Sequence, residues 1–216
     1  LPMSVPMKRA GNLYSRICDR ENLSLAFYKA ARGKRRKADV AAYERLLDRN
    51  LQLLREDLLA RDVAVGEYRY FTVYEPKQRL ICAASFRERV LHHAIMNVLE
   101  PVLDRFQITD SYACRAGKGT EAAVLRASNW CRRYSHFLKL DVRRYFDSVP
   151  HERLLEFLER RIKDRHLLDL LSRIVASYAT APGRGLPIGN LTSQHLANFY
   201  LAHVDHLVKD RMRVQG

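Results

Sequence analysis

The chain has 216 residues, of which 47% are hydrophobic, so it can bury one large core or two small ones and is not expected to be disordered. Its net charge of +14 favours a polyanionic partner, above all nucleic acid, although an anionic membrane surface would satisfy the same charge. No apolar run approaches the roughly 20 residues that cross a bilayer, and no signal-peptide core opens the chain, so we expect a cytoplasmic protein without a membrane partner.

The first third of the chain is predicted to be helical. Residues 13–31 have helical spacing, with Asp19 as a candidate cap, and residues 39–61 carry a leucine-rich face that predicts a packing helix. Between them, residues 32–37 contain five cations in six positions. This run is either a solvated loop or a contact to a nucleic-acid backbone, and the sequence leaves both readings open.

A hairpin is predicted next. Residues 68–74 alternate in the manner of a strand rich in aromatic side chains, and residues 79–83 fit a second strand. The turn between the strands projects Lys77 and Arg79. These cations either bind phosphate groups or are simply solvated.

Basic residues also flank the next predicted helix. Ser85 and Glu88 have the spacing of a capping box that opens this helix, and Arg87 beside them is a candidate contact to a nucleic-acid backbone. Further along, the glycine-bracketed loop 111–120 contains Arg115 and Lys118 and leads into a predicted helix over 121–134. The loop lacks the spacing of a phosphate-binding P-loop, so it is either a nucleic-acid contact or a tight turn.

Residues 137–142 form a short apolar run that contains one carboxylate, Asp141. This pattern predicts a buried strand that ends at a functional site. Because a buried, unpaired carboxylate costs several kcal/mol, Asp141 is expected to need a cation, and magnesium suits its hard oxygen ligands. The competing interpretation is an ordinary strand followed by an aromatic core residue, with Asp141 capping the next helix. Separately, Ser148 is predicted to cap a helix that is entered through Pro150.

The final part of the chain is predicted to place a glycine- and proline-containing loop, 185–194, in front of another helix. Such a loop allows close backbone approach, and the helix end adds a positive dipole, which together suit a base pair and its phosphates.

Two of these segments resemble the reverse transcriptases: Asp141 with Phe146 five residues later, and the loop 185–194. The resemblance covers about residues 68–209. It implies an α+β fold made of fingers and the first part of a palm, divided into residues 1–135 and 136–216. It also implies that Asp141 and the carbonyl of Val142 hold magnesium, and that Phe146 lies under the nucleotide sugar and favours deoxynucleotides.

The resemblance implies further contacts to substrates. Lys77 and Arg79 match the basic positions that meet the incoming triphosphate. The other implied nucleotide-binding residues are Ile188, Gly189 and Gln194, and the implied nucleic-acid contacts are Arg87, Arg115 and Lys118. The expected partners are an RNA template, a DNA primer and deoxynucleoside triphosphates.

One detail resembles a narrower class. Where most bacterial relatives have Gln-Gly and Ser-Pro, this chain has Ile188-Gly189 and Ser193-Gln194, as do the error-prone reverse transcriptases of diversity-generating retroelements. This resemblance adds a small basic accessory protein as a candidate partner. The open alternatives are a retron or phage-defence reverse transcriptase, and a basic nucleic-acid-binding module without catalysis.

Polymerase chemistry of this family uses two magnesium ions, and its other carboxylates come from a Tyr-x-Asp-Asp hairpin. Neither that motif nor any Asp-Asp pair occurs in the 216 residues. We therefore expect RNA-directed DNA polymerase activity from the complete protein and none from this chain by itself.

Overall fold

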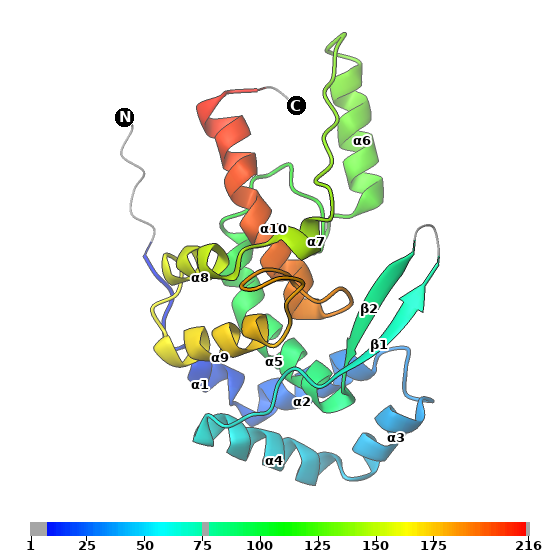
Figure 1. Cartoon of the computed structure of the whole chain (residues 1–216), viewed down its shortest axis with the longest axis vertical. Helices are drawn as coiled ribbons and strands as arrows, with labels where there is room; N and C mark the ends of the chain where they lie inside the picture. Colours follow the sequence, from blue (N-terminus) through cyan, green and yellow to red (C-terminus); the bar gives the residue numbers. More distant parts are fainter. Residues whose placement is uncertain (1–7, 75–77, 215–216) are drawn as a thin grey trace.

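The computed structural model describes residues 8–74 and 78–214. It is helix-rich, with a single two-stranded antiparallel sheet in the described part of the chain, which confirms the expected α+β class (Figure 1). Of the helices within these ranges, none is both long and apolar enough to cross a membrane.

Both helices predicted in the first third are in fact pairs of helices. The first pair is α1, Leu13–Ile17, and α2, Arg20–Ala31, because Asp19 accepts the backbone N–H of Glu21 and starts a new helix. The second pair is α3, Ala38–Arg45, and α4, Leu47–Ala60. Leu46 separates them with non-helical dihedral angles and an exposed side chain, although the apolar face continues on both sides of the break.

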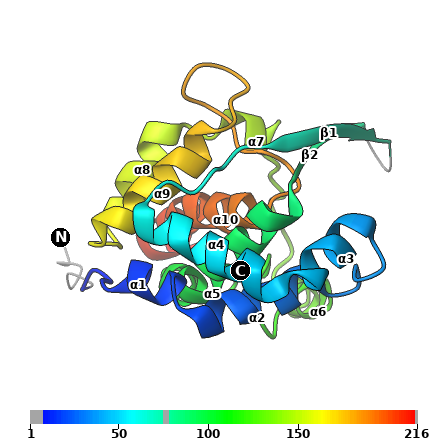
Figure 2. The same cartoon turned by 90° about the horizontal axis from the view of Figure 1, so that it is seen from below.

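Helix α5, Phe86–Asp104, is the centre of the core and packs against α1, α2, α3 and α10 (Figure 2). The Ser85 hydroxyl accepts the Glu88 N–H, as the capping box predicts. The Glu88 side chain does not return to the cap, however: it is buried and accepts the backbone N–H of Gly66 at 2.9 Å. The helix also continues past Pro101 to Asp104.

The predicted hairpin is confirmed. Strand β1, Tyr68–Val73, pairs with β2, Arg79–Ala84, with Tyr68 opposite Ala84 and Val73 opposite Arg79. The hairpin extends away from the helical body (Figures 1 and 2). Lys77 lies outside the described residues, so its predicted contact to the triphosphate stays a prediction.

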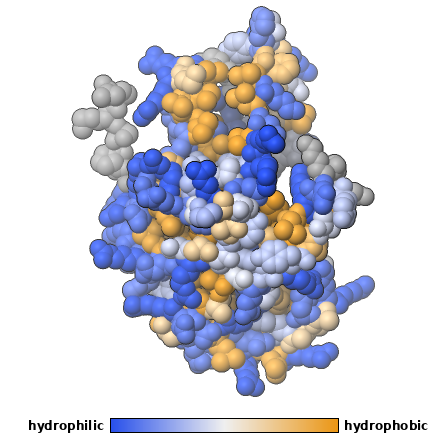
Figure 3. Space-filling view, in the orientation of Figure 1, coloured by the Kyte–Doolittle hydropathy of each residue, from blue (hydrophilic) through white to orange (hydrophobic). Residues whose placement is uncertain are grey.

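The buried strand predicted around Asp141 is wrong. Residues 137–142 form no regular secondary structure, and Phe137, Leu138 and Leu140 are 83%, 81% and 80% exposed. A strand is stabilised by its ladder of backbone hydrogen bonds, and no strand of the described ranges lies beside this segment. The preceding helix α6, Thr120–Cys131, also buries none of its residues. Figure 3 shows hydrophobic residues gathered in this upper part of the molecule.

Within the described residues after α6, the chain forms four α-helices and one π-helix. They are α7, Tyr145–Ser148; α8, His151–Glu159; α9, Arg165–Ala176; α10, Leu191–His206; and η1, Leu207–Arg211. The predicted cap of α8 is wrong, because Ser148 ends α7 and its hydroxyl donates to the carbonyl oxygen of Tyr145. Pro150 occupies the cap position, where its missing N–H costs nothing.

Candidate active site

A cavity of about 870 Å³ lies where strand β2, the segment 141–147 and the residues 178–188 meet. It brings together four residues that the sequence predicted for one site, Asp141, Arg79, Phe146 and Ile188, which are as much as 109 positions apart in the chain (188 minus 79). Its lining also includes residues that the sequence did not single out, namely Gln78, Leu80, Arg143, Arg144, Tyr178 and Thr180.

Backbone hydrogen bonds hold one side of this cavity. The N–H of Leu186 donates to the carbonyl oxygen of Phe146 at 2.8 Å, and the N–H of Gly185 donates to that of Val149 at 3.0 Å. The Tyr145 hydroxyl donates to the carbonyl oxygen of Ala197 in α10 at 2.6 Å. Helix α7, which carries Phe146, is therefore fixed to α10 and to the loop that precedes it.

The same loop is fixed to the hairpin on its other side. Cys82 in β2 donates its backbone N–H to the carbonyl oxygen of Ile188 at 2.8 Å. Gly189 follows with φ of +112°, and a Cβ atom there would lie 2.9 Å from Cγ2 of Ile81. Glycine is required at this position both for its backbone conformation and for the closeness of β2.

Asp141 is exposed, which corrects the expectation of a buried carboxylate. Among the described residues its carboxylate has neither a hydrogen-bond donor nor an ion-pair partner, and Arg79 and Arg143 in the same cavity likewise lack a carboxylate partner. Arg144, by contrast, donates to Asp147 at 2.8 Å. The cavity thus offers one uncommitted carboxylate and two uncommitted cations, a combination that suits a metal-bound polyphosphate.

The side chains around Asp141 meet part of what a magnesium ion requires. Within residues 8–74 and 78–214 no three histidine, cysteine, aspartate or glutamate side chains come together as a ligand set. Magnesium is commonly held by only one or two carboxylates, with water and substrate phosphates completing the shell. The free carboxylate of Asp141 therefore fits part of such a site. Val142, the other predicted ligand, is exposed and does not line the cavity, so the role of its carbonyl stays a prediction.

The other two predicted nucleotide-binding residues lie elsewhere. Gly189 and Gln194 line a separate pocket of about 180 Å³, between α5, the start of α10 and the connection from α2 to α3. Its remaining lining residues are Lys34, Arg89, His92, His93, Asn190 and Leu191. The sequence offered two signals for this pocket, the basic run 32–37 and the adjacent histidines of α5, but nothing in it indicated that they meet.

The three predicted nucleic-acid contacts are engaged within the protein. Arg87 pairs with Asp57, and Lys118 donates to the carbonyl oxygen of Thr109. Arg115 makes the most extensive set of bonds: it donates to Asp104 at 2.5 Å and to the carbonyl oxygens of Ile108 and Ser111. None of the three lines the cavity of Asp141. Their contact to nucleic acid stays a prediction, and Arg115 has an evident structural role in ordering its loop.

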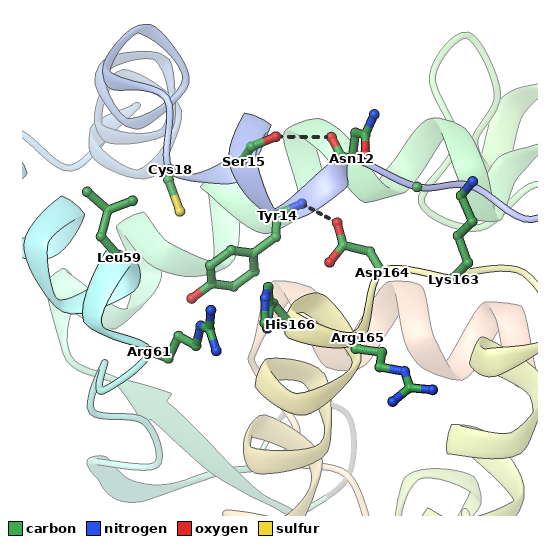
Figure 4. Close-up of a pocket in the computed structure, with 11 residues that line it drawn as sticks. Asn12, Tyr14, Ser15, Cys18, Leu59, Arg61, Lys163, Asp164, Arg165 and His166 are labelled. Carbon is green, nitrogen blue, oxygen red and sulfur yellow. Dashed lines mark hydrogen bonds between the residues drawn. The ribbon is translucent and has the colours of Figure 1, made fainter.

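A further hollow, of about 590 Å³, lies on another part of the molecule between α1 and the start of α9 (Figure 4). It is lined by Arg61, Lys163 and Arg165, and its carboxylate, Asp164, points at the backbone of Tyr14. Asp164 accepts the N–H groups of Leu13 and Tyr14 at 2.8 and 2.9 Å. The Asp164 carboxylate therefore joins the start of α1 to the start of α9, and this hollow does not resemble a catalytic centre.

Comparison with known proteins identifies the family of this chain. Residues 74–215 match the family model of reverse transcriptase (RNA-dependent DNA polymerase), so the chain belongs to the reverse transcriptase family. The protein of COX1/OXI3 intron 1 of Saccharomyces cerevisiae is 23% identical over 166 residues, covering 70% of this chain and 20% of the relative. Protein YkfC of Escherichia coli is 26% identical over 179 residues, covering 74% and 46%.

A solved structure has the same fold. One chain of the structure described as "Partial Cas6-RT-Cas1--Cas2 complex" superposes with a TM-score of 0.59 at 23% identity, covering 93% of this chain and 35% of that chain. This chain therefore spans from 20% to 46% of the length of these similar proteins. The reverse-transcriptase fold expected from the sequence is confirmed.

Proposed function

We propose that this chain forms the fingers, residues 1–135, and the first part of the palm, residues 136–216, of an enzyme that copies RNA into DNA. The observation that carries the proposal is the cavity in which Asp141, Arg79, Phe146 and Ile188 meet. Family membership supports the same reaction class, because its description is that of an RNA-dependent DNA polymerase. The substrates would be an RNA template, a DNA primer and deoxynucleoside triphosphates.

Asp141 and the Val142 carbonyl would hold magnesium, and the bound metal would neutralise phosphate charge and activate the attacking primer hydroxyl. Two magnesium ions are expected, and holding both would need carboxylates in addition to those that line the cavity. Asp141 is exposed and has no partner among residues 8–74 and 78–214, which supports this role, since a carboxylate already bound to an arginine would be less available.

The side chains around Asp141 would position the nucleotide. Arg79 at the start of β2 and the predicted partner Lys77 would neutralise the triphosphate. Phe146 is half-buried, and its ring is held edge-on by Tyr145 at a centroid distance of 5.9 Å. A ring fixed in this way at the sugar would exclude a ribose 2′-hydroxyl by steric contact.

Primer extension by the complete enzyme on an RNA template tests the reaction. We expect incorporation of deoxynucleotides that depends on magnesium and is lost in Asp141→Asn. Phe146→Ala should raise the use of ribonucleotides relative to deoxynucleotides. Phe157→Ala on α8 is the control, because it removes an aromatic ring that lies outside the cavity and should leave this preference unchanged. Magnesium-independent RNA binding without any extension would instead identify a nucleic-acid-binding module.

The narrower biological role that we propose is the error-prone enzyme of a diversity-generating retroelement, with a small basic accessory protein as its partner. Ile188 supports this, because it places an apolar side chain in the cavity wall. The resemblance to bacterial reverse transcriptases implies a glutamine at this position in most of them. Loss of one polar contact near the nascent base pair would lower discrimination by about 1 to 3 kcal/mol.

Sequencing the DNA copies made by Ile188→Gln tests the fidelity role. We expect fewer errors opposite template adenine than in the unaltered enzyme, while Ile188→Leu, which keeps an apolar side chain, should leave the error rate high. If Ile188→Gln copies adenine with unchanged error, the retroelement assignment loses its support. A retron or phage-defence reverse transcriptase then becomes the better account.

A further inference from the structure

The hollow of about 590 Å³ between α1 and the start of α9 has an excess of positive charge (Figure 4). Three exposed cations line it, Arg61, Lys163 and Arg165, and in the described part of the chain none of them forms an ion pair. The carboxylate among its lining residues, Asp164, already accepts two backbone N–H groups of α1. The positive charge of the hollow is therefore not neutralised by the described residues.

Two of these cations are held in place by the backbone around them. The stem of Lys163 lies across Gly11, where a Cβ atom would clash with Cε of the lysine and lie 3.1 Å from its Cγ. The Lys163 N–H also donates to the carbonyl oxygen of Ala10 at 2.8 Å. On the other side, the carbonyl oxygen of Arg61 accepts Nη1 of Arg173 at 2.9 Å. The two side chains thus start from fixed positions at the hollow.

The floor between the cations is apolar and uncharged. Tyr14 and Cys18 are buried there, and the Tyr14 hydroxyl donates to the carbonyl oxygen of Leu58 at 2.6 Å. Burial raises the pKa of Tyr14 to about 12 and that of Cys18 to about 11, so both groups are neutral near neutral pH. Leu59 adds an aliphatic side chain that is 54% exposed. The hollow therefore combines apolar surface with a positively charged rim.

An acidic peptide matches this combination better than a nucleic acid does. Carboxylates pair well with arginine, whose planar fork can donate two parallel hydrogen bonds to one carboxylate. An apolar side chain of the peptide would cover Leu59. Sites that hold single-stranded nucleic acid instead add aromatic rings on which bases stack. The tyrosine ring of this hollow, Tyr14, is 9% exposed and has the His166 ring edge-on to it at a centroid distance of 5.8 Å.

We propose that this hollow binds an acidic segment of a partner protein, with carboxylates of the segment at Arg61, Lys163 and Arg165 and one apolar anchor residue against Leu59. The volume of 590 Å³ is in the range of pockets that enclose a ligand. The charge requirement excludes a strongly basic segment as the occupant.

A partner bound in the hollow would leave the cavity of Asp141 open. The two sites share no lining residue. They lie at opposite ends of α9, because Arg165 opens this helix at the hollow and Tyr178, two residues after its last residue, lines the cavity. A helix of 12 residues is about 18 Å long. The proposal is therefore independent of the proposed function.

The binding of a fluorescein-labelled peptide, made of glutamates around one central leucine, tests this proposal by anisotropy with the complete protein. We expect saturable binding of one peptide per chain. Arg165→Glu should weaken it about tenfold, because repulsion replaces attraction at the rim. The control is Arg49→Glu, an equal change of charge at an exposed residue of α4 outside the hollow. Equal affinity losses in both variants would mean that the peptide senses only net charge, and the proposal would be overturned.

Gly11→Ala tests the position of Lys163 without changing any charge. The added Cβ atom must displace the lysine stem, so we expect about threefold weaker peptide binding. In a Lys163→Gln background the same change should cause no further loss, because the displaced charge is already absent. A loss of equal size in both backgrounds would show that Gly11→Ala acts on the fold and not through the lysine.

Leu59→Gln tests the apolar anchor. It should weaken binding of the leucine peptide about fivefold and leave binding of a peptide with serine in place of leucine unchanged. Leu53→Gln is the matched control, since Leu53 is also an exposed leucine of α4 but does not line the hollow. If Leu59→Gln weakens both peptides equally, the anchor is not at Leu59 and this part of the proposal is wrong.

A short single-stranded RNA with the same net charge as the peptide is the competing probe. If the RNA displaces the peptide, and its own affinity falls in Arg165→Glu but not in Leu59→Gln, the hollow binds nucleic acid and the peptide assignment is overturned. If the peptide binds as expected but the complete enzyme never extends a primer, this proposal stands and the polymerase proposal is overturned. If the enzyme extends primers but the peptide does not bind, the reverse holds.

Discussion

Cys82 donates its backbone N–H to the carbonyl oxygen of Ile188 at 2.8 Å, and this bond joins the hairpin of β1 and β2 to the loop before α10. Arg79 lies on the same strand as Cys82, so the cation expected at the triphosphate and the apolar side chain expected at the base pair are fixed relative to each other. A change in the loop should therefore alter the position of the hairpin as well.

Gly189→Ala should destabilise the protein by about 2 kcal/mol, because alanine strains a backbone with φ of +112° and its Cβ meets Cγ2 of Ile81 at 2.9 Å. Gly117→Ala is the matched control. Gly117 also has positive φ, +70°, but no heavy atom lies within 4 Å of its Cβ position, so only about 1 kcal/mol is expected. Urea unfolding measures both, and equal losses would argue against a tight contact with β2.

Asp141→Asn should reduce DNA synthesis by the complete enzyme by a factor on the order of 100 or more, with little effect on stability. The carboxylate is exposed and makes no internal hydrogen bond within the described ranges, so its loss removes function without removing a structural contact. Asp169→Asn, an exposed aspartate on α9, is the control. Activity that survives Asp141→Asn would contradict a metal-binding role.

Asp164→Ala should cost about 2 to 3 kcal/mol of stability, more than an ordinary helix cap. Asp164 accepts three backbone N–H groups, those of Leu13, Tyr14 and Leu167, at 2.8, 2.9 and 3.4 Å. The comparison is Asp19→Ala, which removes one accepted N–H, that of Glu21 at 3.0 Å, and should cost about 1 kcal/mol. Thermal or chemical unfolding gives both values, and similar costs would mean that α1 does not depend on Asp164.

Stability should decline between pH 6.5 and pH 4 because of His93. Burial, followed by Lys29 and Arg89, lowers the pKa of His93 to about 4. The unfolded chain, with an ordinary histidine pKa near 6.5, therefore binds the proton more tightly than the folded one, and the free energy of unfolding falls as the pH falls through this window.

The loss assigned to His93 is about 2 kcal/mol, less than the full shift because the ring is only half-buried. His93→Gln should flatten the dependence of the unfolding free energy on pH in this window, and His136→Gln, at an exposed histidine, should not. An unchanged slope in His93→Gln would assign the acid sensitivity to other groups.

Local patterns predicted the elements whose signal is local. The alternation of residues 68–74 and the capping box at Ser85 are complete within short windows, and the structure contains β1 and α5 there. Asp19 was predicted as a cap, but one helix was predicted across it, and Leu46 was not predicted as a break, because the apolar face continues across both positions. The strand over 137–142 was predicted wrongly because an apolar run does not reveal whether a pairing strand is present.

The residues of the candidate site were likewise predicted where a local motif indicated them, and not where tertiary packing alone brings them together. Motif resemblance led to Asp141, Phe146 and Ile188, and the cavity contains all three. The second pocket depends on Lys34, Arg89 and Asn190, which come from three separate parts of the chain. Such a meeting is a product of tertiary packing, and no spacing along the sequence indicates it.

The contacts of Asp164 also impose an order on the folding of a newly made chain. Leu13 and Tyr14 depend on a carboxylate about 150 residues later, and the adjoining bridge between Ala10 and Ile162 spans the same separation. At typical synthesis rates this interval lasts roughly 8 to 30 seconds. During that time α1 can pack against α5, but its first backbone N–H groups lack the carboxylate that accepts them, so the amino-terminal helix is among the first parts to be synthesised and among the last to complete its contacts.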